Sequence, residues 1–414
     1  MFEQNQSAKL WTTSFISLTL CSLLLFLNLQ MLLSSFPAYV KEEFQAGDLM
    51  VSLVTSLFAL SAIVTRFLTA ALMRRMSRGT LLYAGLIIAG AVTSVYLLAD
   101  SMGSLLVMRV LYGIGFGMAS TIIPTLVSQI IPGNRMGEGI GYFGLSTSLA
   151  MSIGPVIGMN IMNEFGFGPL TITGAIVVLL AVPLLFATKS IPPEKKPPAK
   201  VQHTGTPAAP AEPAAKRAVI YSQLILPALL NMIVAITYSG LLSFIVLFGK
   251  SVHLEQVGLF FLFNVITIVI IRPISGRIFD SRGHGAVLIP AAISIVASMT
   301  ILSFTTTMPT LILSALLYGL GFGAIQPTLQ AWMLRSCSTE QHGTANGMYY
   351  NSTDLGVAAG AIILGAISSA TSYATMYLYS AGVMVLFLAA YLLGRMLVAR
   401  QQQAAGQVTE HSGV

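Results

Sequence analysis

The stretch "LYGIGFG" at Leu111–Gly117 returns as "LYGLGFG" at Leu317–Gly323, with six of the seven positions identical. A glycine run of this kind suits a phosphate-binding loop, a surface on which helices pack closely, or the trace of a duplication. Of the 414 residues, 55% are hydrophobic and 8% are charged, whereas about a quarter of the residues in soluble domains are charged. The composition therefore indicates a membrane protein.

Twelve apolar runs are each long enough to cross about 30 Å of hydrocarbon as a helix. They cover residues 11–35, 48–73, 79–98, 103–128, 137–160, 168–188, 218–248, 254–279, 285–304, 309–334, 343–369 and 372–398. Residues 189–217, rich in Pro, Ala and Lys, predict a flexible linker. The sequence thus predicts an all-α integral membrane protein with an N-terminal six-helix half at 1–188, this linker, a C-terminal half at 218–399 and a tail at 400–414.

The two glycine runs are related by a shift of 206 residues, which also aligns Arg66 with Arg272. The same shift aligns the connection at 66–79 with the connection at 272–285. A constant shift over several spans indicates two six-helix units that arose by duplication and enter the membrane from the same side.

The context of the glycines argues against a ligand loop. A phosphate-binding loop follows a strand and opens a soluble helix, whereas these glycines lie inside the fourth and tenth spans. The Gly-x-x-x-x-Gly-Lys-Ser/Thr pattern of ATP-hydrolysing proteins does not occur. The glycines are therefore expected to let neighbouring helices approach closely.

Orientation follows from the positive charges, which are retained on the cytoplasmic side of bacterial membranes. The odd-numbered connections contain two, Lys41 and Lys250, while 16 lie in or beside the tails, the even-numbered connections and the linker. Both termini are expected in the cytoplasm of a bacterial cell, with the chain in the inner (plasma) membrane. The basic residues do not cluster with aromatic residues in a soluble segment, so no nucleic acid partner is expected.

Three motifs resemble those of the major facilitator superfamily, in particular its 12-span drug:proton antiporters. "GRIFDSRG" (Gly276–Gly283) is similar to the family's Gly-x-x-x-Asp-x-x-Gly loop, in which the Asp, here Asp280, is thought to tie the halves together in one state. The first half departs from this pattern at three positions, which hold Ala70, Arg74 and Ser77.

"RVLYGIGFG" (Arg109–Gly117) resembles the fourth-span signature associated with proton coupling, and Arg109 matches its arginine. "AMSIGPVIG" (Ala150–Gly158) resembles the Gly-Pro-x-x-Gly motif of exporters. Such a sequence is expected to give a bendable, closely packed helix face against the opposite half. The resemblance implies gating or conformational roles for Gly154, Pro155, Gly158, Arg66, Arg272, Gly276, Arg277 and Asp280.

Asp354 is the one acid placed well inside an apolar run by the span map. A carboxylate at that depth must pair, protonate or face water, so Asp354 is either a proton carrier or a structural partner, for example of Arg66. Arg109 stays protonated at pH 7. It is expected to act on a nearby acid, to bind an anionic substrate group, or to hydrogen-bond to helix carbonyls.

The first span contains Asn28 and Gln30 in place of the acid found in many multidrug antiporters, which makes a strictly cationic cargo less suitable. Further polar or aromatic residues suit a substrate cavity at a repeat interface, although each suits a hydrogen bond between helices equally well. These candidates are Tyr142, Asn231, Tyr238, Asn264, Gln326, Asn346, Tyr349 and Asn351. The cysteines and histidines are scattered, so neither a metal site nor a cofactor is predicted.

These features favour a secondary transporter that exports small amphipathic or zwitterionic molecules, coupled to protons, as a monomer in the lipid bilayer. A second hypothesis is a dedicated exporter of an endogenous metabolite such as a siderophore or other metal chelator. A nontransporting membrane sensor is a remote third. An enzyme is not expected, because the chain has no recognisable pair of nucleophile and base.

Overall fold

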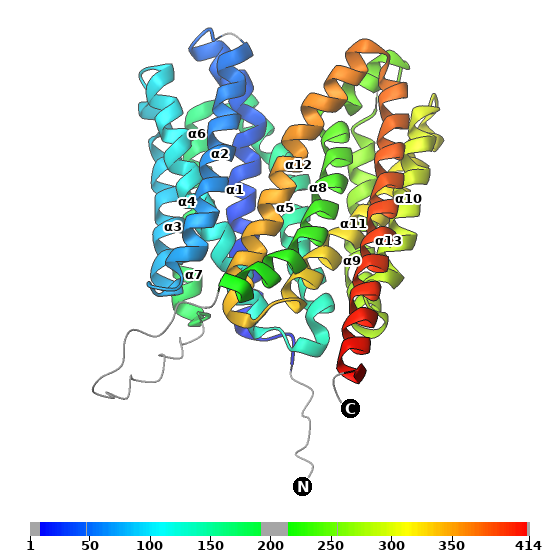
Figure 1. Ribbon diagram of the computed structural model, residues 1–414. Helices are drawn as coiled ribbons and strands as arrows, with labels where there is room; N and C mark the ends of the chain where they lie inside the picture. The colour runs from blue at the N-terminus through cyan, green and yellow to red at the C-terminus, as the bar shows by residue number, and fades with distance from the viewer. Residues whose placement is uncertain (1–8, 47, 192–213, 255, 412–414) are drawn as a thin grey trace, which may run out of the picture. The chain divides into compact units, whose positions relative to one another are not determined.

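The computed structural model describes residues 9–46, 48–191, 214–254 and 256–411, which contain helices and no strand (Figure 1). The α-helices are α1 (Thr13–Glu43), α2 (Asp48–Leu72), α3 (Arg78–Val95), α4 (Met102–Ile130), α5 (Met136–Phe165), α6 (Phe167–Leu179), α7 (Ala181–Thr188), α8 (Ala214–Ser251), α9 (Leu259–Arg282), α10 (Gly285–Ser303), α11 (Met308–Arg335), α12 (His342–Ala370) and α13 (Tyr373–His411). Short 3₁₀ turns, η1 (Tyr96–Leu98), η2 (Gly133–Arg135) and η3 (Thr339–Gln341), lie between some of them.

Within the described residues, twelve helical stretches are long and apolar enough to cross a membrane. They coincide with the twelve predicted runs, so the predicted fold class is confirmed. One detail differs from the prediction: the sixth span, Phe167–Thr188, is divided at Leu180 into α6 and α7.

Polar side chains cap several of these helices. The Thr12 hydroxyl accepts a hydrogen bond from the Phe15 N–H, and the Ser101 hydroxyl accepts one from the Ser104 N–H. Such caps satisfy backbone donors that have no partner within the first turn of a helix. At the other end, α5 and α9 stop at Gly166 and Gly283, whose φ angles of 85° and 79° suit glycine best.

The chain forms two compact units. Unit 1 contains residues 1–221 and 334–351, and unit 2 contains residues 222–333 and 352–414. Helix α12 therefore contributes its first part to unit 1 and the rest to unit 2. The predicted linker falls mainly on residues 192–213, which lie outside the described ranges, and the predicted domain boundaries stay a prediction.

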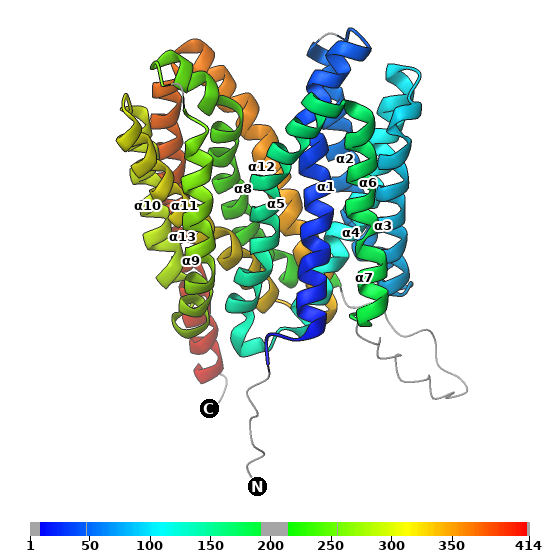
Figure 2. The same ribbon diagram turned by 180° about the vertical axis from the view of Figure 1, so that it is seen from behind.

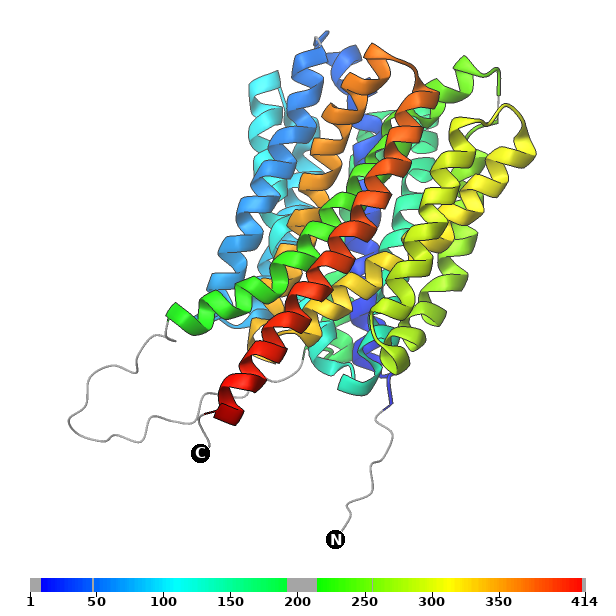
Figure 3. The ribbon, with the colours of Figure 1, turned by 45° about the vertical axis from the view of Figure 1, so that its right-hand side comes forward.

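Each unit has its own helix contacts. In unit 1, α4 packs against α2 and α3, and α1 packs against α5 and α6 (Figure 2). In unit 2, α10 packs against α9 and α13, which is the red helix of Figure 3.

The duplicated glycines lie where helices touch in unit 1. A Cβ atom added to Gly113 would lie 2.7 Å from the Phe58 carbonyl oxygen, and one added to Gly117 would lie 2.8 Å from the Ala62 carbonyl oxygen, both on α2. A Cβ atom on Gly115 would lie 2.8 Å from the carbonyl oxygen of Gly85 on α3. The glycines of α4 thus alternate between two neighbouring helices.

Unit 2 repeats this arrangement residue by residue at the same shift of 206. Gly319 packs against Asn264 and Gly323 against Ile268, both on α9, while Gly321 packs against Ala291 on α10. These partners correspond to Phe58, Ala62 and Gly85 of unit 1. The glycine runs are therefore helix-packing surfaces duplicated with their partners, as the sequence predicted.

Candidate functional site

Arg109 lies fully buried inside unit 1. Its Nε atom donates to the Val54 carbonyl oxygen (3.0 Å) and its Nη1 atom donates to the Tyr96 hydroxyl (3.3 Å). The centre of the guanidinium lies 4.5 Å, 4.8 Å and 5.4 Å from the ring centroids of Phe36, Phe58 and Tyr112. Nη2 has no hydrogen-bond partner among the described residues.

The Arg109 cage, formed by these four aromatic side chains and the Val54 carbonyl, contains one of the three anticipated kinds of contact. One hydrogen bond goes to a helix carbonyl, as in the structural alternative. The remaining contacts are cation–π interactions and a tyrosine hydroxyl, and in the described part of the chain no carboxylate pairs with Arg109. Cation–π contacts contribute more in a desolvated site such as this one than at an exposed surface.

A second polar group in unit 1 surrounds Arg66 of α2, which is also buried. Its Nη1 atom donates to the Asn351 side-chain oxygen (3.1 Å), and its Nε atom lies 3.4 Å from the Ser120 hydroxyl. The guanidinium lies 5.9 Å and 5.7 Å from the ring centroids of Phe116 and Tyr350. The structure thus brings together two predicted residues, Arg66 and Asn351, while a pair between Arg66 and Asp354 stays a prediction.

Polar contacts continue along the seam between α4 and the first part of α12. The Ser128 hydroxyl lies 2.8 Å from Nδ1 of His342, and the Asn346 amide lies 3.5 Å from the Thr125 hydroxyl. His342 is the first residue of α12, and its ring is buried at this seam. On α4, the hydroxyl residues Thr121, Thr125 and Ser128 are spaced four and three residues apart, which places them on one face of the helix. This spacing is the pattern in the sequence that could have indicated the polar seam.

Unit 2 contains a hydrogen-bonded polar network around Asn231 of α8. The Asn231 amide nitrogen lies 2.8 Å from the Ser352 hydroxyl and 2.7 Å from the Thr353 hydroxyl, both on α12. Its amide oxygen accepts a hydrogen bond from the Gln326 amide of α11 (3.0 Å). Asn231 and Gln326 were predicted separately, whereas Ser352 and Thr353 were not singled out.

Asp354 follows this network directly in α12 and is half-buried. Three consecutive residues, Ser352, Thr353 and Asp354, therefore carry oxygen atoms on a helix that spans the membrane. Polar groups in spans are costly, so a run of this kind next to a buried amide network marks a candidate functional segment of unit 2.

The exporter-type glycines of α5 pack on α1. A Cβ atom on Gly154 would lie 2.5 Å from the Cβ atom of Gln30, and one on Gly158 would lie 2.7 Å from the Cα atom of Met31. The prediction that this face lies against the opposite half is wrong for these two glycines, because their missing side chains let α5 approach a helix of its own unit. Pro155 lies between them within α5.

Unit 2 contains the matching contact between α12 and α8. A Cβ atom on Gly360 would lie 2.8 Å from the Cα atom of Ile236. By the shift of 206, Gly360 corresponds to Gly154 and Ile236 to Gln30. Close packing of these helix pairs is therefore a property of both units.

The loop motif differs between the units for a conformational reason. In unit 2, Gly283 adopts a positive φ and ends α9. In unit 1 the corresponding residue, Ser77, has a φ of −64° and caps α3 by accepting a hydrogen bond from the Thr80 N–H (3.1 Å). On α9, Arg272 and Gly276 are buried, Asp280 is half-buried and Arg277 is exposed.

The remaining candidates include one residue, Asn28, that contacts the Arg109 cage. Asn28 is buried and engaged within unit 1: its amide nitrogen donates to the Gly174 carbonyl (2.8 Å) and its oxygen accepts from the Tyr112 hydroxyl (2.6 Å). Gln30 is partly exposed. Two of the other candidates contact aromatic rings: Tyr142 is in edge contact with Trp11, and Tyr238 is stacked on Phe322. Asn264 is buried on α9, where it packs against Gly319. Tyr349 is buried on α12 in edge contact with Tyr350.

One buried acid was missed. Glu138 near the start of α5 is 5% exposed and forms an ion pair of 2.8 Å with Arg135 of η2. Glu138 is the second residue of the predicted run 137–160, and its burial was not predicted. An arginine three residues before a glutamate at a helix start is the pattern that could have indicated the pair.

His284 and Cys337 are ionisable side chains outside the spans whose pKa values are shifted. Burial lowers the pKa of His284, which stacks on Trp332 with ring centroids 4.1 Å apart, and the charge of Arg395 lowers it further. Burial raises the pKa of the Cys337 thiol to about 12. Near pH 7 the imidazole is therefore neutral and the thiol protonated.

The sequence model of the Major Facilitator Superfamily matches the chain over residues 18–361, with a second match over residues 287–411. The chain belongs to this superfamily and is a multi-pass membrane transporter. Its similarity to individual members is modest.

Three relatives illustrate the range. An uncharacterised MFS-type transporter of Methanocaldococcus jannaschii is 23% identical over 339 residues, covering 81% of this chain and 86% of that protein. The staphylopine export protein of Staphylococcus aureus is 19% identical, covering 86% of this chain and 89% of that protein. The multidrug resistance protein MdtG of Escherichia coli is 22% identical, covering 81% of each chain.

Solved structures share the fold. The human organic anion transporter TETRAN matches with a TM-score of 0.75 at 16% identity, covering 91% of this chain and 98% of that one. The proton:xylose symporter XylE matches with a TM-score of 0.69 at 12% identity, covering 92% of this chain and 95% of that one. At these identities the likeness concerns the fold.

Proposed function

We propose that this transporter exports small amphipathic or zwitterionic molecules in exchange for protons, by alternating access of its two halves. The observation that carries the proposal is the polar segment of α12. Asp354 is a half-buried carboxyl group in a spanning helix, directly after two hydroxyl groups that are fixed by Asn231. Such a carboxyl can take up a proton when dehydrated and release it when its surroundings open to water.

Two further observations support export. The Gly-Pro-x-x-Gly segment of α5 packs closely on α1, and two of the relatives are an export protein and a multidrug resistance protein. Arg109 supplies a fixed positive charge in this proposal, because a guanidinium does not lose its proton at pH 7. We place the protein in a bacterial plasma membrane as a monomer, with both termini in the cytoplasm.

The proton-coupling role of Asp354 is tested in everted membrane vesicles. Norfloxacin, a zwitterionic fluorescent drug, serves as the transported probe. A pH-sensitive dye reports the proton movement that follows the addition of norfloxacin. We expect norfloxacin to release protons from vesicles with the unmodified protein, and Asp354→Asn to reduce this signal at least tenfold.

Glu164→Gln is the matched control, since Glu164 is an exposed acid near the end of α5. It removes one carboxyl group without touching the polar segment of α12 and should leave the proton signal unchanged. Equal signals from Asp354→Asn and the unmodified protein would exclude Asp354 as the coupling acid.

A second candidate function is the export of one endogenous metabolite of the metal-chelator class. The staphylopine export protein, aligned over 86% of this chain, is the observation that favours it. An untargeted comparison of metabolites retained by cells with and without the protein separates the two. Accumulation of a single chelating compound in the deletion strain supports the dedicated exporter, whereas drug sensitivity without such accumulation supports the broader one.

A further inference from the structure

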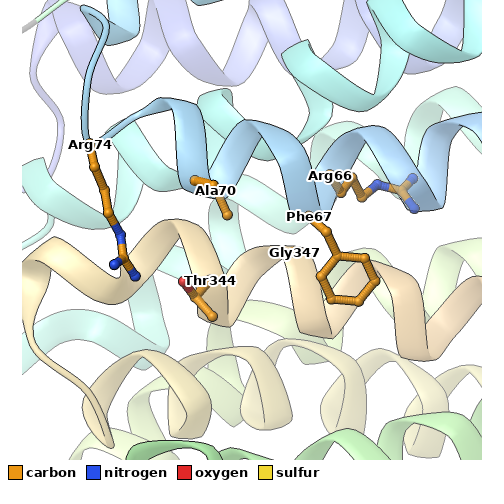
Figure 4. A pocket seen from close by; sticks show the side chains of 7 residues that line it. Arg66, Phe67, Ala70, Arg74, Thr344 and Gly347 are labelled. Atoms are coloured by element: carbon orange, nitrogen blue, oxygen red, sulfur yellow. The ribbon is translucent and has the colours of Figure 1, made fainter. Parts of the chain in front are cut away.

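A small groove lies within unit 1 beside the end of α2. Its volume is about 90 Å³, about six times the space that one water molecule needs by the same kind of measure. It is lined by Arg66, Phe67, Ala70, Ala71 and Arg74 on one side and by Thr344 and Gly347 of α12 on the other (Figure 4). None of these seven residues is acidic, and two are arginines.

Arg74 is the exposed charge of this groove. In Figure 4 its side chain extends toward the helix that carries Thr344. No other side chain in the described part of the chain hydrogen-bonds or pairs with its guanidinium group. Arg66, by contrast, is buried and turned toward Asn351. The Arg74 guanidinium therefore has N–H donors available in the planar arrangement that binds a phosphate group well. The Thr344 hydroxyl lies on the opposite wall of the groove.

The apolar surface next to the groove indicates where this ligand comes from. Val64, Phe67 and Leu68 of α2 are 49%, 57% and 56% exposed. They belong to the stretch Leu53–Leu72, which is long and apolar enough to cross a membrane. Arg74 follows two residues after that stretch, at the level where lipid headgroups begin. A phosphate at Arg74 thus has apolar side chains about two helical turns away, along the direction in which acyl chains run.

We propose that this groove binds the headgroup of an anionic phospholipid. Arg74 holds the phosphate, the Thr344 hydroxyl donates a hydrogen bond to it, and Phe67 contacts the start of an acyl chain. Basic pockets beside spanning helices favour such lipids over zwitterionic ones.

The duplication makes this a property of unit 1 alone. By the shift of 206 residues, Arg74 corresponds to Asp280 and Ala70 to Gly276. The two halves therefore carry opposite charges at equivalent positions, and the acidic counterpart is unsuited to a phosphate. The departure of the first half from the family's loop pattern is, in this proposal, the origin of a lipid site.

The test is native mass spectrometry of the purified full chain, titrated with phosphatidylglycerol or phosphatidylcholine of identical acyl chains. We expect phosphatidylglycerol to bind more tightly, and Arg74→Gln to weaken it about fivefold, the effect of one basic residue at a membrane surface. Arg75→Gln is the control: it removes the neighbouring exposed arginine, which does not line the groove, and should change the affinity less than twofold.

Two results would overturn the proposal. One is an unchanged preference for phosphatidylglycerol in Arg74→Gln or in Thr344→Val, with both variants unfolding at the same temperature as the unmodified chain. The other is complete displacement of the lipid by inorganic phosphate, which would make the groove a site for free anions. Arg74→Asp, which reproduces the residue type of unit 2, should abolish the preference.

Discussion

Arg109 is a charged residue stabilised without an acid. One guanidinium N–H group has no hydrogen-bond partner among the described residues, at a cost of about 1–3 kcal/mol. Three rings lie within 5.4 Å of the charge, and a desolvated cation–π contact is worth up to about 2 kcal/mol. The ring contacts of the cage are therefore comparable in size to the cost of the unmet donor.

Replacing Arg109 by methionine separates the role of its charge from the role of its volume. An apolar side chain of similar size can substitute for a buried charge at little cost, so we expect the unfolding temperature of Arg109→Met to stay within a few degrees of the original. Export should fall at least tenfold, because the fixed positive charge is lost. Thermal unfolding in detergent and norfloxacin efflux are the two measurements.

Arg109→Lys is the matched variant, since it keeps the charge but loses the planar fork. Partial activity in Arg109→Lys and none in Arg109→Met would assign the role to the charge. Full activity in Arg109→Met would leave Arg109 with a packing role only.

At the scale of single residues, the sequence predicted that Arg109 is a buried charge with a functional or structural role. A helix carbonyl was among its predicted partners. The sequence could not predict the rings of Phe36 and Phe58, because these lie on α1 and α2, and spacing along one helix says nothing about which other helices pack against it. The partner Asn351 of Arg66 was out of reach for the same reason.

At the scale of helices, the glycine runs hold α4 against α2 and α3, and hold α11 against α9 and α10. Gly115→Ala places a methyl group 2.8 Å from the Gly85 carbonyl oxygen and 2.6 Å from the Ala89 nitrogen. Backbone atoms of a packed helix cannot move aside cheaply, so we expect a destabilisation of about 1–3 kcal/mol. Thermal unfolding of the purified variant measures it.

Gly382→Ala in α13 is the matched control, because no atom lies within 4 Å of a Cβ atom at this position. Alanine is the better helix former by up to about 1 kcal/mol, so this variant should be as stable as the original or slightly more stable. Loss of stability in Gly382→Ala and none in Gly115→Ala would contradict the packing role of the glycine runs.

Helix contacts were partly predictable. The repeated Leu-Tyr-Gly-x-Gly-Phe-Gly motif predicted close packing at both glycine runs, and the shift of 206 residues relates the residues that they pack against as well. For α5 the sequence indicated close packing but assigned the wrong neighbour, because a glycine face shows that a helix is approached closely and not which helix approaches it. In the structure this neighbour is α1, at Gln30 and Met31.

At the scale of the whole molecule, the two units share a packing plan but not their polar chemistry. Where unit 1 carries Arg109, unit 2 carries the buried Ala315, beside Ser314 and Ser298, whose hydroxyl groups lie 3.0 Å apart. Unit 2 in turn has the Asn231 network. The duplication therefore preserved the scaffold, while the residues proposed for coupling differ between the halves.

The orientation of the chain is a prediction that labelling can test. In a Cys21→Ser, Cys337→Ser background, we expect a membrane-impermeant thiol reagent to label Asp100→Cys in intact cells. Met76→Cys, in the connection that contains Arg74, Arg75 and Arg78, should react only after permeabilisation, because positive charges stay in the cytoplasm. Both positions are exposed, so the reverse pattern would refute the proposed orientation.

The central claim, proton-driven export, is tested most directly in proteoliposomes with an acidic lumen and no other energy source. We predict that norfloxacin accumulates inside against its gradient in excess of protein-free liposomes and of liposomes with Asp354→Asn, and that a protonophore abolishes this excess. Accumulation equal to that of protein-free liposomes would contradict the account, as would transport that only equilibrates norfloxacin whether or not the pH gradient is present.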